Sequence, residues 1–298
     1  MGAVIVAGLV SGSIYALVAS GLSLVWGALG VFNFAHGALL MVGAFVAWWV
    51  SDPAGLGLGL FAGIAASMIF MIAAGGLLYL LLVRPWVGTP AVELTVIMTT
   101  VAGAMFLENL ALYVFGARLK ALDQVVTGTV TIFGTAMQAQ NLLVIVLAPL
   151  LLGALALFLK LSKHGLAIRA IAQNDEAARL LGIRVEFTYL VTFAVSALLA
   201  GIAGVMIGGL FNITPSMGND PLLRAFLVVV FGGLGSLPGT IIAAYLIGLI
   251  EAARLLGIRV EFTYLVTFAV SALRRARRGG ALAARGGGGR RRALRLHR

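Results

Sequence analysis

Long apolar runs constrain this chain more than any other feature of its sequence. Hydrophobic residues make up 61% of its 298 residues and charged residues only 10%, and its mean hydropathy is +1.10. A soluble domain carries about 25% charged residues, so a soluble fold of this composition could not cover its surface with polar groups. A helix crosses the hydrocarbon core with about 20 apolar residues. We therefore expect an all-α, polytopic transmembrane helical bundle with broken helices and roughly six to eight spans.

The apolar segments are separated by glycine, proline or charged residues. They cover about residues 2–27, 38–50, 56–83, 92–115, 142–159, 187–210 and 225–250. Two breaks, Asn33–Gly37 and Gly232–Gly239, fall within apolar sequence. Irregular backbone at membrane depth is tolerated only against protein or a water-filled cavity, so these breaks are the expected places for a substrate path. Residues 212–224, with two prolines and a glycine, are expected to form an outer loop.

The most polar stretch before the C-terminal tail, residues 160–186, predicts the orientation of the chain. It contains five of the eleven Lys and Arg residues that precede position 274. Positive charge marks cytoplasmic loops, so we expect this stretch to be a cytoplasmic loop. Two spans, the fourth and the fifth, separate this loop from the turn at Arg84, so the turn is expected on the same side of the membrane.

An unusual C-terminal region carries almost all of the net charge of +11. Residues 274–298 contain ten Arg and no Asp or Glu, which leaves +1 on residues 1–273. Residues 251–273 repeat residues 176–198 letter for letter over 23 positions. Genuine structural repeats diverge in sequence and recur at a regular period. We interpret residues 251–273 as an artefactual duplication and the Arg/Gly-rich tail as frameshifted or disordered.

A genuine basic tail that binds anionic lipid is the alternative interpretation of residues 274–298. This tail has no aromatic residues to stack on bases, so we expect no nucleic-acid partner. Residues 1–250 are the expected transmembrane domain, with the 160–186 loop inside it.

Several kinds of chemistry are excluded by composition. The chain has no cysteine, so disulfides, thiolate metal sites and cysteine nucleophiles are excluded. The glycines of Gly232–Gly239 are followed by no Walker A lysine, so any ATP hydrolysis takes place on another chain. Three histidines and scattered acids form no known catalytic pattern. We expect no enzyme, no cofactor and no metal site.

The polar loop contains the sequence EAARLLG at residues 176–182. A short helix with small residues can lie in a cleft of another protein, and the final glycine lets the chain turn back toward the membrane. The alternative is an ordinary surface helix between two spans. The pattern resembles the cytoplasmic coupling loop of ABC importer permeases, which would make Glu176, Ala177, Ala178 and Gly182 the residues that couple to an ATPase.

Further stretches extend this resemblance over most of the chain. They are Gly12–Leu17, Asn33–Gly37, Arg169–Asn174 and Gly232–Gly239. In this order they are similar to the LivH-type permeases of branched-chain amino acid ABC transporters. The resemblance makes residues 1–250 a transmembrane permease domain. It also implies that the chain should continue past residue 250 into further spanning sequence, so the repeat and the tail put closure of the bundle in question. The resemblance implies a second permease subunit, two cytoplasmic ATPase subunits and a periplasmic substrate-binding protein, in the bacterial inner (plasma) membrane with its lipid. Relatives with similar motifs carry urea or short amides, so the substrate stays open at this point.

Polar residues and glycines within apolar sequence are the candidates for the substrate path. These candidates are Tyr15, Asn33, His36, Glu108, Gly232 and Gly233. A buried His or Asn can instead cap a broken helix, and Tyr15 can be a packing residue. Glu108 lies within the fourth span, where a carboxylate is a functional candidate, or it lies near the outer end of that span and faces water.

A secondary transporter driven by ions through Glu108 is the competing function. The coupling loop separates the two functions, because a secondary transporter has no ATPase to dock. Two small-residue pairs, Gly8 with Gly12 and Gly204 with Gly208, also predict close contacts between helices.

Overall fold

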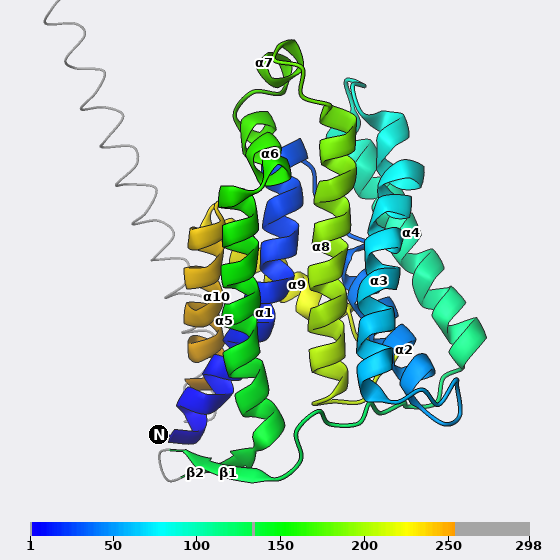
Figure 1. Cartoon of the computed structure of the whole chain (residues 1–298), viewed down its shortest axis with the longest axis vertical. Coiled ribbons are helices and arrows are strands. Elements are labelled where there is room, and N and C mark those ends of the chain that lie inside the picture. Colours follow the sequence, from blue (N-terminus) through cyan, green and yellow to red (C-terminus); the bar gives the residue numbers. More distant parts are fainter. Residues whose placement is uncertain (1, 133–134, 254–298) are drawn as a thin grey trace, which may run out of the picture. The chain divides into compact units, whose positions relative to one another are not determined.

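A computed structural model describes residues 2–132 and 135–253 of the chain. Its helices are α1 (Gly2–Leu29), α2 (His36–Ser51), α3 (Leu60–Leu78), α4 (Val92–Phe115), α5 (Ala139–Leu161), α6 (Lys163–Gln173), α7 (Asp175–Leu180), α8 (Val185–Gly208), α9 (Asn219–Gly232) and α10 (Leu237–Ala252). A π-helical turn (Tyr79–Val83) and a 3₁₀ turn (Arg84–Trp86) extend α3, and the antiparallel strands β1 (Thr129–Ile132) and β2 (Thr135–Gln138) precede α5. Figure 1 shows the arrangement of these elements.

The compact unit that contains these elements ends at Ala252. The predicted duplicate, residues 251–273, begins at the end of α10, and its residues 254–273 lie outside the described part of the chain. The predicted tail, residues 274–298, lies outside it entirely. Both interpretations stay predictions.

Five of the described helices are long and apolar enough to cross a membrane. They are α1, α3 with its two extending turns, α4, α5 and α8. The apolar helices α2 and α10 have 16 residues each. At 1.5 Å per residue they reach about 24 Å, which is less than the ~30 Å of the hydrocarbon core. The predicted helical bundle with broken helices is confirmed.

The expected outer loop at residues 212–224 is wrong in its second half. Helix α9 begins at Asn219, so Pro221 lies in its first turn and Arg224 lies within the helix. Proline is tolerated in the first turn of a helix, where its missing N–H group would have no helical partner. The proline that suggested a loop therefore lies in the first turn of a helix.

The helices α1 and α8 form the centre of the unit. Helix α1 packs against α10, α8, α9 and α5, and α8 packs against α1, α2 and α3. Figure 1 shows α1 in dark blue between α5 and α8. Helices α4 and α5 are far less buried along their apolar length than α1 and α8 are. The surfaces of α4 and α5 are therefore suited to contact lipid or another protein.

Close approach at glycines makes this packing possible, as the sequence predicted. A Cβ atom on Gly12 would lie 2.9 Å from Cδ1 of Tyr245 on α10. A Cβ atom on Gly43 of α2 would lie 2.5 Å from the Cα atom of Gly201 on α8. Gly204 of α8 faces the carbonyl oxygen of Leu40 on α2. Helices that pack in lipid approach each other through such small residues.

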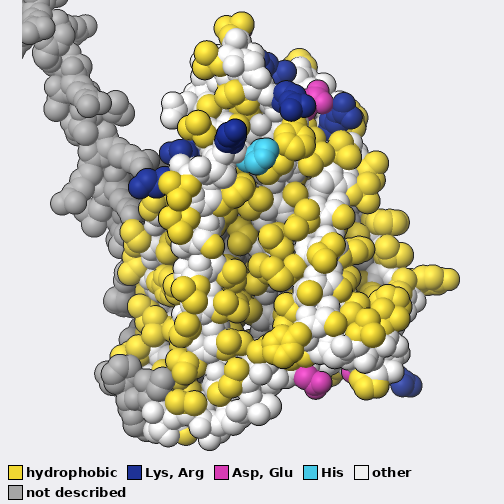
Figure 2. All heavy atoms as spheres, viewed as in Figure 1, with side chains coloured by type: hydrophobic (Ala, Val, Ile, Leu, Met, Phe, Trp, Pro, Cys, Tyr) yellow, Lys and Arg dark blue, Asp and Glu magenta, His cyan; other side chains and the backbone are white. Residues whose placement is uncertain are grey.

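The two segments predicted to be cytoplasmic lie at one end of the unit. Arg84, after α3, forms an ion pair of 3.1 Å with Glu186, near the start of α8. The Arg84 turn and the 160–186 stretch therefore lie at the same end of the unit, as predicted. Figure 2 shows most of the Lys and Arg side chains of this face gathered at that end, above a largely hydrophobic surface. The positive-inside rule predicts that this end is cytoplasmic, and it is named the cytoplasmic end on that basis.

The packing at Gly204 predicts a specific sensitivity. The substitution Gly204→Ala places a methyl group against the backbone of α2. Backbone atoms cannot change rotamer to make room for this group, so we expect the free energy of unfolding to fall by about 1–3 kcal/mol. Gly153→Ala on α5 is the matched control, because nothing lies within 4 Å of a Cβ atom there. Titration of both detergent-solubilised variants with SDS, followed by circular dichroism, measures the difference. Equal midpoints would contradict the packing.

Candidate functional site

Two short helices, α6 and α7, form the cytoplasmic segment between α5 and α8. The side chain of Ser162 accepts a hydrogen bond of 2.8 Å from the N–H group of Gly165 and so caps α6. Asn174 caps α7 in the same way, through a bond of 2.9 Å from the N–H group of Ala177. Gly182 ends the segment with φ of +80°, which favours glycine. The sequence thus specifies two separately capped helices at this end.

Helix α7 projects from the cytoplasmic end, as Figure 1 shows. Among the predicted coupling residues, Ala178 is buried, whereas Glu176, Ala177 and Gly182 are exposed. The next two apolar side chains point outward: Leu180 is 85% exposed and Leu181 is 81% exposed. Adjacent leucines exposed outside the apolar spans are suited to burial against another protein.

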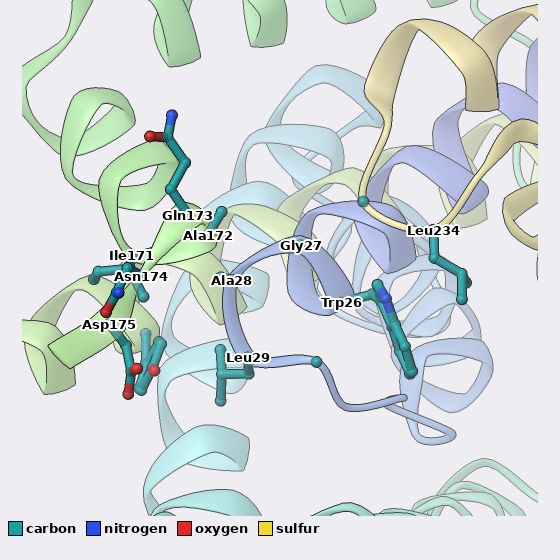
Figure 3. Close-up of a pocket in the computed structure, with 13 residues that line it drawn as sticks. Trp26, Gly27, Ala28, Leu29, Ile171, Ala172, Gln173, Asn174, Asp175 and Leu234 are labelled. Atoms are coloured by element: carbon teal, nitrogen blue, oxygen red, sulfur yellow. The ribbon is translucent and has the colours of Figure 1, made fainter. Parts of the chain in front are cut away.

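A cavity of about 560 Å³ lies beside this segment. One wall is the end of α1 (Trp26–Leu29 and Gly30), and another is the joint between α6 and α7 (residues 171–175). Tyr189 of α8 and the α9–α10 turn (Leu234 and Gly235) complete the lining. Figure 3 shows Asn174 and Asp175 on one side of this space and Trp26 and Leu234 on the other. A displacement of α7 would therefore change a cavity that α1 and the α9–α10 turn also line.

The Gly232–Gly239 break forms the turn between α9 and α10. A Cβ atom on Gly232 would lie 2.5 Å from the Cα atom of Thr240, so this glycine lets the two helices meet. Gly233 has φ of +94° and Gly235 packs against Gly27. The turn thus lies at the cytoplasmic end of α1, apart from the Asn33–Gly37 break. A path role for Gly232 and Gly233 stays a prediction.

The Asn33–Gly37 break lies deep in the bundle and is held by His36. This side chain is fully buried. Its Nε2 atom donates a hydrogen bond of 3.0 Å to the carbonyl oxygen of Val18 on α1. Its Nδ1 atom lies 3.3 Å from the hydroxyl oxygen of Ser196 on α8, which donates a bond of 2.9 Å to the carbonyl oxygen of Gly21. His36 therefore ties the start of α2 to both central helices.

Asn33 and Gly37 complete this junction. The Oδ1 atom of Asn33 accepts a hydrogen bond of 3.1 Å from the N–H group of Ala35, and its Nδ2 atom is buried without a partner in the described part of the chain. Gly37 packs against Gly218, the residue before α9, so the start of α2 meets the start of α9. Two interrupted segments, separated by some 180 residues of sequence, are thus brought together.

The structure places Tyr15 and Glu108 in different surroundings. Tyr15, on α1, donates a hydrogen bond of 2.6 Å to Glu251 near the end of α10. Glu251 also forms an ion pair with Arg224 of α9. Glu108 is half-buried on α4 and forms no hydrogen bond or ion pair with any other described residue. The six path candidates are therefore not brought together into one site, and their roles stay predictions.

Sequence reasoning missed Arg224 and Glu251. Arg224 was assigned to a loop, and Glu251 was treated as the first residue of the repeated stretch. The two charges flank the apolar segment 225–250. The glycine-rich break in its middle, which lets the segment fold back on itself, was the signal that its two ends could meet. Among the described residues, no group of three His, Cys, Asp or Glu side chains could hold a metal ion.

Comparison with known proteins gives a consistent result over most of the chain. The family model described as the permease component of branched-chain amino acid transport systems matches residues 4–270. The high-affinity branched-chain amino acid transport system permease protein LivH of Escherichia coli K12 is 29% identical over 278 residues, covering 89% of this chain and 90% of that protein.

Two further relatives agree with this family. BraD of Pseudomonas aeruginosa, a high-affinity branched-chain amino acid permease protein, is 32% identical over 260 residues, covering 83% of this chain and 84% of its own. A probable branched-chain amino acid permease protein of Methanocaldococcus jannaschii is 30% identical over 247 residues, covering 79% of this chain and 75% of its own. No solved structure matches the chain.

The contacts of His36 predict a structural role that can be measured. His36→Ala removes a fully buried ring and its two polar contacts, so we expect a loss of about 2–4 kcal/mol in unfolding free energy. His164→Ala, an exposed histidine on α6, is the control and should change stability by less than ~0.5 kcal/mol. Thermal unfolding in detergent compares them. If His36→Ala is as stable as the control, the contacts of His36 do not stabilise the packing of α2 against α1 and α8. A role for His36 in the substrate path would then be favoured.

Proposed function

The chain belongs to the family of permease components of branched-chain amino acid transport systems, and we propose that it forms the membrane-spanning path of an ATP-driven importer for leucine, isoleucine and valine. Relatives named for this transport cover most of the chain at about 30% identity. The long apolar helices of the unit make it a multi-pass membrane protein. The bacterial relatives support the bacterial inner membrane as its location.

The energy for transport is assigned to other chains. The sequence has no Walker A lysine after its glycine-rich turn, so it supplies no ATPase site of its own. We assign hydrolysis to two cytoplasmic ATPase subunits. A second permease subunit would complete the path, and a periplasmic binding protein would deliver the amino acid.

Helix α7 is the surface that we assign to ATPase docking. The observation that carries this assignment is the exposure of Leu180 and Leu181 on a capped helix that projects from the cytoplasmic end. A groove in an ATPase subunit that accepts a short helix would bury both leucines. Arg179 and Arg184 are exposed beside them and are suited to an acidic rim of such a groove.

The contacts of the segment provide a route from α7 to the spans. Ala178 packs inward, and Ile168 and Ile171 of α6 are buried in the same hydrophobic cluster as α1. The cavity beside Asn174 and Asp175 is lined by the end of α1 as well. Movement of a docked α7 would thus act on α1, whose other neighbours include α8, α9 and α10.

Removal of the two leucines tests the docking surface. Burial of a leucine side chain contributes about 1.5–3 kcal/mol, so the double variant Leu180→Ala with Leu181→Ala should weaken ATPase binding by roughly 100-fold or more. The control is Leu58→Ala with Leu119→Ala. Both of these leucines are 65% exposed, and both lie in connections at the opposite end of the unit.

Co-purification of the tagged permease with its ATPase subunits gives the readout, with size-exclusion chromatography to confirm folding. We expect the ATPase to be lost from the α7 variant and retained by the control. Retention of the ATPase by both variants would remove α7 as the docking surface.

A further inference from the structure

Three polar side chains meet where α1, α9 and α10 pack together. The guanidinium group of Arg224 on α9 forms an ion pair with the carboxylate of Glu251 on α10. The hydroxyl of Tyr15 on α1 donates a hydrogen bond of 2.6 Å to the other oxygen of that carboxylate. The guanidinium carbon also lies 5.7 Å from the centre of the Tyr15 ring. The three groups therefore form one connected cluster from three different helices.

The cluster lies within the bundle, along the first half of α1. One or two turns before Tyr15, Gly8 packs against Leu249 and Gly12 packs against Tyr245. The hydroxyl of Ser13 lies 3.2 Å from that of Tyr245, which adds a polar contact between the same two helices. Charged groups between apolar helices are costly to the extent that they leave water.

Packing of α1 against α10 gives no reason for a charge pair at this point. The close contacts at Gly8, Gly12 and Gly248 already join the two helices through small residues. A partly exposed ion pair such as this one contributes little net stability. An ion pair that stabilises the fold so little is suited to a functional role.

The cluster is only partly buried. The side chain of Arg224 is 38% exposed and that of Glu251 is 22% exposed. By comparison, His36 and Ser196 in the junction at the centre of the bundle are almost completely buried. The described residues therefore cover the two charged groups only in part.

The charges have the arrangement that an α-amino acid requires. Such a molecule carries a carboxylate and an ammonium group on one carbon, just as the cluster holds a cation and an anion side by side. We propose that Arg224 binds the carboxylate of the transported amino acid and that Glu251 binds its ammonium group, with Tyr15 positioning the Glu251 carboxylate. This assignment rests on the proposed function and adds the residues that select its substrate class. It takes Glu251, through which α10 continues to Ala252, as a genuine residue at the junction where the predicted duplication begins.

Binding of the amino acid is favourable because Arg224 and Glu251 each exchange the other for an oppositely charged group of the ligand. One internal ion pair is replaced by two ion pairs with the ligand, and the net charge of the site is zero before and after. The planar guanidinium group can bind a carboxylate through two parallel hydrogen bonds. An uncharged urea or amide would leave both groups unpaired if it separated them, so the site discriminates against such molecules.

Uptake of labelled leucine by the complete importer in proteoliposomes tests this assignment. Arg224→Gln and Glu251→Gln should each lower the uptake rate at least about 10-fold, because each removes one charge-assisted contact. Glu93→Gln, an exposed carboxylate at the start of α4, is the matched control and should keep the wild-type rate.

Chemical restoration of the charge separates binding from folding. The chain has no cysteine, so Arg224→Cys can be modified selectively before assembly with cysteine-free partner subunits. Aminoethyl methanethiosulfonate restores a positive charge, whereas methyl methanethiosulfonate adds only a neutral group. We expect the aminoethyl reagent to restore uptake several-fold and the methyl reagent to restore none.

Two results would overturn the assignment. Wild-type uptake by Arg224→Gln and Glu251→Gln, or equal rescue by both reagents, would show that the ion pair is structural while leaving the proposed function intact. If the wild-type importer takes up no amino acid, the proposed function and this assignment fail together.

Discussion

The rest of this structure depends on one constraint: within lipid, every backbone N–H and C=O group needs a hydrogen-bond partner in the protein. Breaks in a membrane helix survive only where protein or an enclosed cavity satisfies the exposed groups. In the break before α2, the N–H group of Ala35 donates to Oδ1 of Asn33, and the N–H group of Phe34 donates to the hydroxyl of Thr100 on α4. The ring of His36 then connects α2 to Val18 of α1 and to Ser196 of α8. The contact between Gly37 and Gly218 then brings the start of α9 to the same point. The two central helices are thus fixed relative to both interrupted segments, and the other elements pack around them.

Helix α1 connects the parts of the molecule that the proposed function requires. Its cytoplasmic end lines the cavity beside the α6–α7 joint, its middle accepts a hydrogen bond from His36, and Tyr15 reaches the charged cluster with Arg224 and Glu251. A single helix of 28 residues thus links the surface assigned to ATPase docking with the cluster assigned to the amino acid. Rigid-body motion of one helix is a sufficient way to couple the two sites.

Most of the fold followed from local sequence, because lipid imposes a simple rule on helix length and charge. The apolar runs predicted the spans. The two spans between the Arg84 turn and residues 160–186 predicted that both lie at the same end, which the ion pair of Arg84 with Glu186 confirms. The EAARLLG motif identified α7, because its cap and its final glycine are local signals. The charged cluster could not be predicted in the same way. Two of its members, Tyr15 and Glu251, lie more than 200 residues apart in sequence. Only the packing of α1 against α10 brings them together.

The central claim is that this chain moves amino acids with energy from ATP hydrolysed by partner subunits. Proteoliposomes that contain the importer, its binding protein and labelled leucine test the claim, with ATP at the cytoplasmic face and ionophores that abolish Na⁺ and proton gradients. The account predicts that leucine accumulates when ATP and the ATPase subunits are present, that ionophores do not reduce this accumulation, and that removal of the ATPase subunits abolishes it. Accumulation without the ATPase, driven by an ion gradient and lost on Glu108→Gln, would contradict the account and identify a secondary transporter.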